Sequence, residues 1–266
     1  MSREEFSQHP LRSILAYVVP PAALLIGIVA FWEFYVDWRD ISIIVVPPPS
    51  AVVERFFENP DFFWKEGGYT LYEATLGLAF GSSVAIALAV LMAHSKLAER
   101  TFLPLAIVIK VTPLVAIAPV LVIIFGFGTT PKIIVAALLS FFPTLINAMT
   151  GFRDVNEGAH SFLRSVHASR WQVFWKLRVP SAMPYLFAAL KVTYPLALIG
   201  AVVAEWFTGD RGLGLVIFSA NANLDTPTLF VAIGVLAITG VTINIVLSVI
   251  ERRVLFWHES VRSTTT

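Results

Sequence analysis

The chain has 266 residues, of which 57% are hydrophobic and only 14% are charged, whereas about a quarter of the residues in an average soluble domain are charged. This composition excludes an ordinary soluble domain and predicts an integral membrane protein. The 19 Lys and Arg residues nearly balance the 18 Asp and Glu residues, so the total charge indicates no nucleic-acid partner, and none is expected. The absence of cysteine excludes disulfides, thiolate chemistry and cysteine metal sites.

Six segments are long and apolar enough to cross a bilayer, which takes about 20 residues each. Several contain proline, which lipid-embedded helices tolerate because neighbouring helices satisfy the freed backbone groups. The sequence therefore predicts an all-α membrane protein with six transmembrane helices. No small-residue cleavage site follows the first segment, so we expect a retained anchor and not a signal peptide. In chain order the segments are about Leu15–Phe34, Tyr69–Ala93, Thr101–Phe125, Pro131–Gly151, Ala182–Phe207 and Leu229–Ile250.

The positions of Lys and Arg predict the orientation of the chain. With the N-terminus in the cytoplasm, 12 of them fall in inside segments and 5 in outside segments, among them Lys132 and Arg211. Inside loops carry the excess of positive charge in membrane proteins, so both termini are expected in the cytoplasm. The expected organisation is a cytoplasmic tail at residues 1–14, a transmembrane domain at 15–251 with its longest inside loop at 152–183, and a cytoplasmic tail at 252–266.

That inside loop contains the stretch "SVHASRWQVFWKLRVPSAMP". We expect two short helices here: one ends near His167, and the other starts at or just after Ser169, which would be its N-cap. Pro180 is expected to stop the second helix and Pro184 to open the next crossing. The aromatic side chains of this loop would form an exposed apolar patch unless another surface covers them. Two surfaces could cover them: the lipid headgroup layer, or a groove in a partner protein into which the two short helices insert their apolar side chains.

The stretch resembles the cytoplasmic coupling loop of permease subunits from ATP-binding-cassette importers. The family pattern reads Glu-Ala-Ala, three residues, Gly, nine residues, Ile-x-Leu-Pro. Here Ser161–Leu163 stand at the opening triplet, His167 at the Gly and Pro180 at the Pro, so the Glu and the Gly are absent. Histidine is among the residues that adopt positive φ more readily than most. The resemblance implies contacts to the ATPase from Leu163, Ser165, His167, Ala168, Ser169, Arg170, Trp171, Phe174, Lys176 and Pro180.

The likeness covers Pro47–Glu251, and Thr112–Phe152 and Ala201–Ile217 carry it most clearly. These stretches look like the permeases for nitrate, sulfonate, taurine and bicarbonate, and those for thiamine-precursor pyrimidines and riboflavin. The resemblance implies a type I importer in the bacterial inner membrane, with a permease homodimer, two cytoplasmic ATPase subunits and an outside solute-binding protein. The chain has no GxxxxGK[ST] motif, so ATP must be bound by a partner. No enzymatic activity, cofactor or metal is expected of the chain itself.

Charged residues inside the predicted helices are candidates for the translocation pathway or a gate, because such groups are costly in a membrane unless paired or hydrated. The candidates are Lys110, Lys191 and Glu205. Each lysine has an alternative role as a snorkelling side chain or a structural ion pair. Glu205 could instead be a satisfied charge at a helix end or a contact for the binding protein, and Glu73 has the same ambiguity.

Two stretches of small residues are expected to serve structure. "GDRGLG", at Gly209–Gly214, predicts a turn into a short outer helix at the mouth of the pathway and not a nucleotide site. A second group predicts close packing of the second transmembrane helix against a neighbour, and consists of Gly77, Gly81, Ser82, Ser83 and Ala85.

The solute remains open between a pyrimidine- or riboflavin-like molecule, which is favoured slightly, and a sulfonate- or nitrate-like anion. Aromatic residues predicted on the outer side are the reason for this preference: Trp38, Phe62, Phe63, Trp64, Trp206 and Phe207. A secondary transporter with an interfacial amphipathic loop is the alternative function. It would be expected to show inverted internal repeats, and no second copy of any segment is evident.

Overall fold

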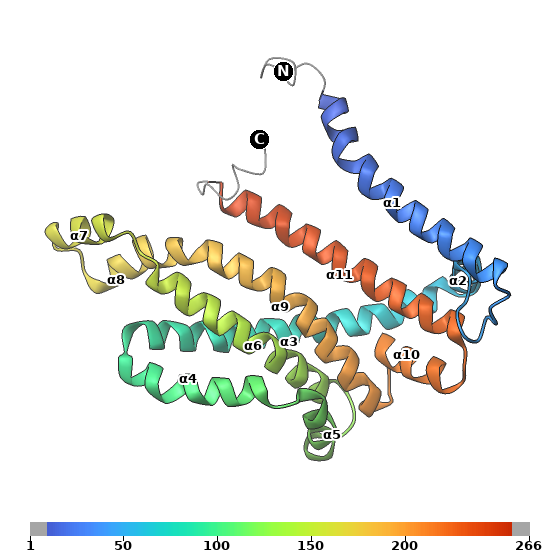
Figure 1. Cartoon of the computed structure of the whole chain (residues 1–266). Helices are drawn as coiled ribbons and strands as arrows, with labels where there is room; N and C mark the ends of the chain where they lie inside the picture. The colour runs from blue at the N-terminus through green and yellow to red at the C-terminus, as the bar shows by residue number, and fades with distance from the viewer. Residues whose placement is uncertain (1–9, 257–266) are drawn as a thin grey trace. The chain divides into compact units, whose positions relative to one another are not determined.

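The chain folds into helices joined by short loops (Figure 1), as seen in a computed structural model that describes residues 10–256, apart from the side chains of residues 10–18 and 114. No strand occurs within 10–256. The predicted tails at 1–14 and 252–266 lie largely outside this range. The helices are α1 (Pro10–Trp38), α2 (Pro49–Glu58), α3 (Pro60–His94), α4 (Lys96–Val111), α5 (Leu114–Phe125), α6 (Thr129–Arg153), α7 (Glu157–Ser165), α8 (Arg170–Val173), the π-helical turn η2 (Phe174–Arg178), α9 (Val179–Thr208), α10 (Leu213–Ala222) and α11 (Thr226–Val254).

Five stretches of described helix are long and apolar enough to cross a membrane, and a sixth is obtained when α4 and α5 count as one bent span. The predicted set of six apolar segments is thereby confirmed. The third segment is the bent one: a break of 100° separates α4 from α5. Thr112 and Pro113 lie at the break, both with extended backbone. Proline disfavours helical backbone in the residue before it, so the break follows from the sequence.

The described chain divides into two units. The first contains residues up to Pro60 together with Ala220–Val231. Within it, the Ser50 hydroxyl donates to Glu33 at 2.6 Å, and Arg55 pairs with Asp225 at 3.0 Å. Trp32 packs against Phe230, with 5.5 Å between the ring centroids. These contacts join α1, the short α2 and the start of α11.

The second unit contains Asp61–Ser219 and the chain from Ala232 onward. Its core is built from small residues that let helix backbones approach, as in membrane proteins generally. A Cβ at Gly77 of α3 would lie 2.8 Å from the backbone oxygen of Ile133 in α6, and one at Gly200 of α9 would lie 2.8 Å from Cα of Ala136. The predicted small-residue face of α3 is thus packed on α6, except for Ser83, which is exposed.

The expectation that Pro180 ends a helix and Pro184 begins another is wrong. Helix continues from Arg170 to Thr208, with Pro180 in the first turn of α9 and Pro184 inside it. A proline normally clashes with the carbonyl four residues earlier. Here the preceding turn, η2, is π-helical, and the Val179 N–H bonds to the Phe174 carbonyl five residues back. The wider turn makes room for the proline ring, so the chain leaves the loop without a break.

Candidate functional site

A helix–turn–helix projection occupies the predicted coupling loop. Asn156 caps α7 by accepting a hydrogen bond from the Ala159 N–H at 2.9 Å. Ser169 caps α8 in a capping box, in which its hydroxyl accepts from the Gln172 N–H and the Gln172 side chain accepts from the Ser169 N–H. The N-termini of α7 and α8 are therefore both fixed by local hydrogen bonds. The two predicted short helices and the Ser169 cap are confirmed.

His167 makes the turn between these two helices. Its φ is 55°, which is the left-handed region that most residues avoid. The Ala168 N–H donates to the Leu163 carbonyl at 2.9 Å, which closes the end of α7 as in a helix ending with a left-handed residue. His167 thus adopts a backbone conformation that glycine adopts without steric cost.

An aromatic cluster attaches the projection to the helices beneath it. The Phe174 ring stacks on Phe152 of α6 at 6.0 Å and lies 5.8 Å from the His94 ring at the end of α3. On its other side Phe174 contacts Trp171 at 5.8 Å and Trp175 at 5.4 Å. Val173 is buried, whereas Trp171 is 69% exposed and Trp175 is 55% exposed. The projection therefore has a packed inner side and an aromatic outer side.

The base of the projection is fixed by charged groups. Arg153, at the end of α6, forms a two-point ion pair with Glu99 of α4, at 3.0 and 2.7 Å. The same guanidinium donates to the Met92 carbonyl of α3 at 3.2 Å. Tyr185 of α9 donates a hydrogen bond to Asp154. Four helices are therefore tied together where the loop begins and ends, so a force on the projection would be passed to all of them.

The structure brings the predicted coupling residues together on this projection. Three are partly buried in its inner side, namely Leu163, Ala168 and Phe174, and Pro180 is partly buried in α9. The others are exposed: Ser165, His167, Ser169, Arg170, Trp171 and Lys176. The exposed set offers two cations beside an indole ring, a combination that suits protein contact as well as lipid contact.

A buried charge cluster lies at the other end of α6. Lys132 is fully buried, and its ammonium group contacts Glu73 of α3 at 3.1 Å, Asp210 at 2.6 Å and the carbonyl of Arg211 at 3.0 Å. Burial alone would raise the pKa of Asp210, but the hydrogen bond and charge from Lys132, together with hydrogen bonds from the Arg211 backbone and Thr208, outweigh it and lower that pKa. Lys132 belongs to the first turn of α6 and so lies at the start of the predicted segment Pro131–Gly151, although it counts among the outside charges for the orientation. A lysine next to an apolar run reads as a flanking charge, so only the packing reveals this role.

Side chains of α3 and α9 accept hydrogen bonds from the backbone N–H groups at the start of α10. The Gly212 N–H donates to Glu66 at 2.6 Å, the Leu213 N–H to the Thr70 hydroxyl at 2.9 Å and the Gly214 N–H to Glu205 at 2.5 Å. The Thr70 hydroxyl in turn donates to Glu205 at 2.7 Å. Carboxylates stabilise a helix N-terminus. The fully buried Glu205 therefore has a structural role at the start of α10. The predicted turn and short helix at "GDRGLG" are confirmed.

The two lysines predicted as pathway candidates have different surroundings. Lys191 of α9 forms an ion pair with Glu251 of α11. Lys110, near the break between α4 and α5, is exposed and its ammonium lies 4.7 Å from the centroid of the Phe142 ring. The structure therefore does not bring Lys110, Lys191 and Glu205 together. Among the residues described, no group of three His, Asp or Glu side chains could hold a metal ion.

Comparison with known proteins gives consistent matches. The sequence profile described as "Binding-protein-dependent transport system inner membrane component" matches residues 77–256. The chain is 31% identical to the riboflavin transport system permease protein RibX of Chloroflexus aurantiacus, over 94% of this chain and 95% of that protein. It is 29% identical to the formylaminopyrimidine transport permease protein ThiX of Halalkalibacterium halodurans, over 90% and 96%. For the taurine transport system permease protein TauC of Escherichia coli, the identity is 28%, over 87% and 86%.

Solved structures show the same fold. A structure of the MetNI methionine ABC transporter in an inward-facing conformation matches with a TM-score of 0.64 at 18% identity, covering 72% of this chain and 96% of that chain. An amino acid ABC transporter crystallised with histidines matches with a TM-score of 0.63 at 18% identity, over 75% and 97%. The helical architecture, the apolar spans and the sequence matches agree: the chain belongs to the family of inner membrane components of binding-protein-dependent transport systems.

Proposed function

We propose that the chain is the permease subunit of an ATP-driven importer and that its helix–turn–helix projection docks into a separate ATPase subunit. The observation that carries this proposal is the two-sided projection. Its inner side is packed through Phe174, while Trp171 and Trp175 remain exposed on its outer side. Exposed indole rings beside cations are typical of the anchors that dominate protein interfaces. A chain without a phosphate-binding motif needs such a dock, because a partner must supply the energy.

The partners and the orientation follow from this proposal. Two copies of the permease pair around a central pathway, two ATPase subunits bind on the cytoplasmic side, and a solute-binding protein delivers the solute from outside. Both termini lie in the cytoplasm, which places the projection on the side of the ATPase. The excess of Lys and Arg in the inside segments supports this orientation. The chain itself performs no catalysis, in keeping with relatives that are transport permeases.

The mechanism would use the rigid base of the projection. When the ATPase subunits close on ATP, the projections of two permeases move together. Arg153 passes this motion to α3, α4 and α6, because it bonds to Glu99 and to the Met92 carbonyl. The helices then open the pathway toward the outside. Hydrolysis reverses the movement.

Lys110 is our candidate for a pathway residue. It is exposed near the α4–α5 break and contacts the face of the Phe142 ring, so its charge is available to a solute. Lys191 and Glu205 are engaged with Glu251 and with the α10 N-terminus. We propose that these two support the pathway by holding α9 in place.

The solute is a small organic molecule or anion. Relatives with similarity over most of their length are named for riboflavin, formylaminopyrimidine and taurine. The first two solutes contain flat heterocycles, and the third carries a sulfonate.

Co-purification tests the dock directly. The chain is co-expressed with its candidate ATPase subunit and purified through a tag on the permease, with and without replacement of residues 165–176 by Gly and Ser. The proposal is supported if the ATPase is recovered with the intact chain and lost with the replaced one, while the replaced subunit is still found in the membrane. If the intact pair fails to associate in detergent and again in lipid, the projection is an interfacial element and the chain is a different class of transporter.

A further inference from the structure

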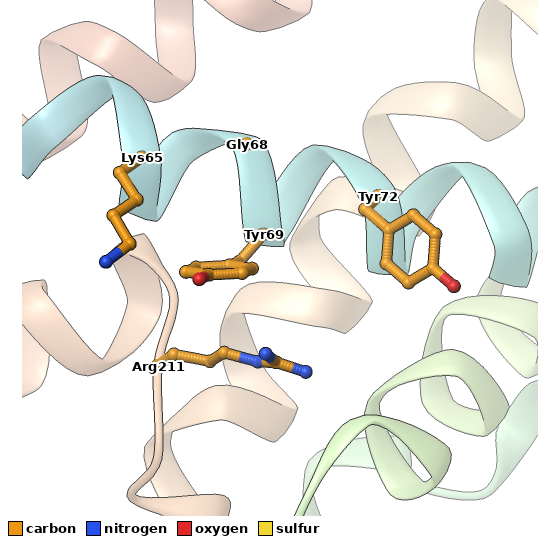
Figure 2. Close-up of a pocket in the computed structure, with 5 residues that line it drawn as sticks. All are labelled: Lys65, Gly68, Tyr69, Tyr72 and Arg211. Carbon is orange, nitrogen blue, oxygen red and sulfur yellow. The ribbon is translucent and has the colours of Figure 1, made fainter. Parts of the chain in front are cut away.

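A cavity of about 460 Å³ opens beside the N-terminal half of α3, and five residues line it: Lys65, Gly68, Tyr69, Tyr72 and Arg211. Figure 2 shows that the first four come from α3, whereas Arg211 reaches in from the loop between α9 and α10 and extends along the Tyr69 ring. All five belong to the second unit. The volume lies within the range of small-molecule sites, about 300–1,000 Å³.

Arg211 is held in place, and 40% of its side chain stays exposed. Its guanidinium lies 4.5 Å from the centroid of the Tyr69 ring, and one of its terminal nitrogens donates to the Thr129 hydroxyl at 2.8 Å. Its Nε is buried without a hydrogen-bond partner, and it forms a longer ion pair with the Asp210 carboxylate at 3.8 Å. Stacking and one hydrogen bond thus hold a planar fork that suits a carboxylate, sulfonate or phosphate group.

The carboxylates near the cavity make their shortest contacts to donors other than Arg211. Asp210 and Glu73 contact Lys132, and Glu66 accepts the Gly212 N–H. The lining itself contains two cations and no acid. An anion that enters therefore meets Arg211 and the exposed Lys65 without a competing carboxylate in the wall, while the two tyrosine rings offer flat apolar surfaces.

The length of α3 places the cavity within reach of water. At about 1.5 Å per residue, the 35 residues of α3 extend to about 52 Å, which exceeds the roughly 30 Å of a hydrocarbon core. The cavity residues of α3 lie in its first 13 positions, next to the charged residues Asp61 and Glu66. This part of α3 is thus suited to the level of the headgroups and beyond.

We infer that this cavity binds the oxyanion group of a small organic solute, with Arg211 and Lys65 as the anion ligands and Tyr69 and Tyr72 as walls for a flat or apolar body. The inference rests on the proposed import function and specifies the solute class as an organic anion. In the proposed orientation the cavity faces the side from which the binding protein delivers its solute. A lipid phosphate has the same anionic chemistry, so the experiment must separate the two sources.

The test uses the full-length subunit in discs of zwitterionic lipid and follows the ¹⁹F signal of 4-fluorobenzenesulfonate. Saturable binding is expected. Arg211→Gln should weaken it by about tenfold or more, the effect of losing a charge-assisted hydrogen bond, and Lys65→Gln by a smaller factor. The matched control Arg39→Gln alters an exposed arginine outside the cavity and should leave binding unchanged. The neutral 4-fluorobenzenesulfonamide should bind at least about tenfold more weakly, for the same reason.

Several results would overturn the inference. Absence of saturable binding would do so, as would equal binding of the neutral probe, or unchanged binding in both Lys65→Gln and Arg211→Gln. Displacement of the probe when phosphatidylglycerol is added to the discs would assign the cavity to a lipid headgroup. Because the ATPase co-purification is a separate measurement, a subunit that binds the ATPase but not the probe would refute only this inference.

Discussion

The buried ion pair between Lys132 and Glu73 allows a quantitative test of the structure. All three N–H donors of the ammonium group are used, by Glu73, Asp210 and the Arg211 carbonyl. Lys132→Met removes the charge and keeps much of the volume. Glu73 is 1% exposed and would remain as an uncompensated buried carboxylate, whereas Asp210, whose side chain is 32% exposed, can return to water. Breaking a buried pair in this way costs about 3–5 kcal/mol.

The free energy of unfolding is measured by titrating sodium dodecyl sulfate into the protein in dodecyl maltoside micelles and following tryptophan fluorescence. The exposed Lys96→Met serves as the control and should change stability by no more than about 0.5 kcal/mol. The double variant Lys132→Met with Glu73→Met should recover about 2 kcal/mol of the loss, because no buried charge is then left unpaired. A loss below about 1 kcal/mol in the single variant, or a double variant whose losses simply add, would refute the assignment of a buried ion pair.

Three further predictions concern other parts of the molecule. Trp171→Ala should weaken the complex with the ATPase about 30-fold, or about 2 kcal/mol, without changing membrane insertion; unchanged affinity in a pull-down titration would count against the dock. Gly77→Val should destabilise the subunit by about 1–3 kcal/mol, because a Cβ there would lie 2.8 Å from the Ile133 oxygen; stability equal to that of the unaltered chain would contradict the close α3–α6 contact. Burial raises the pKa of Asp225, but hydrogen bonds from Thr228 and from Arg55 outweigh it and lower that pKa below 3.8. Asp225→Asn should therefore reduce stability at neutral pH, and the difference from the unaltered chain should fade as the pH drops below 3.8 toward the lowered value; a difference independent of pH would exclude this carboxylate as its source.

Much of the helix–turn–helix projection could be predicted from local sequence. Ser169 followed by Gln172 is a capping pair, and a histidine at the glycine position is compatible with a left-handed turn. These features depend on a few neighbouring residues, so reading the chain in order is enough to find them. That the helix continues through Pro180 could not be predicted in this way, because it depends on the preceding turn, which is π-helical while Phe174 packs on Phe152.

The buried charge cluster illustrates what only tertiary structure decides. Composition and apolar run length determine that the chain is a membrane protein with six apolar segments, because crossing a bilayer demands length and low polarity of each segment separately. Composition and run length do not determine which charged side chains form ion pairs with one another. Glu73, Lys132 and Asp210 are 59 and 78 residues apart along the chain, yet the packing of α3, α6 and the loop after α9 brings them into contact. A flanking lysine and a buried one have the same local sequence, and the difference between them exists only once the helices have packed.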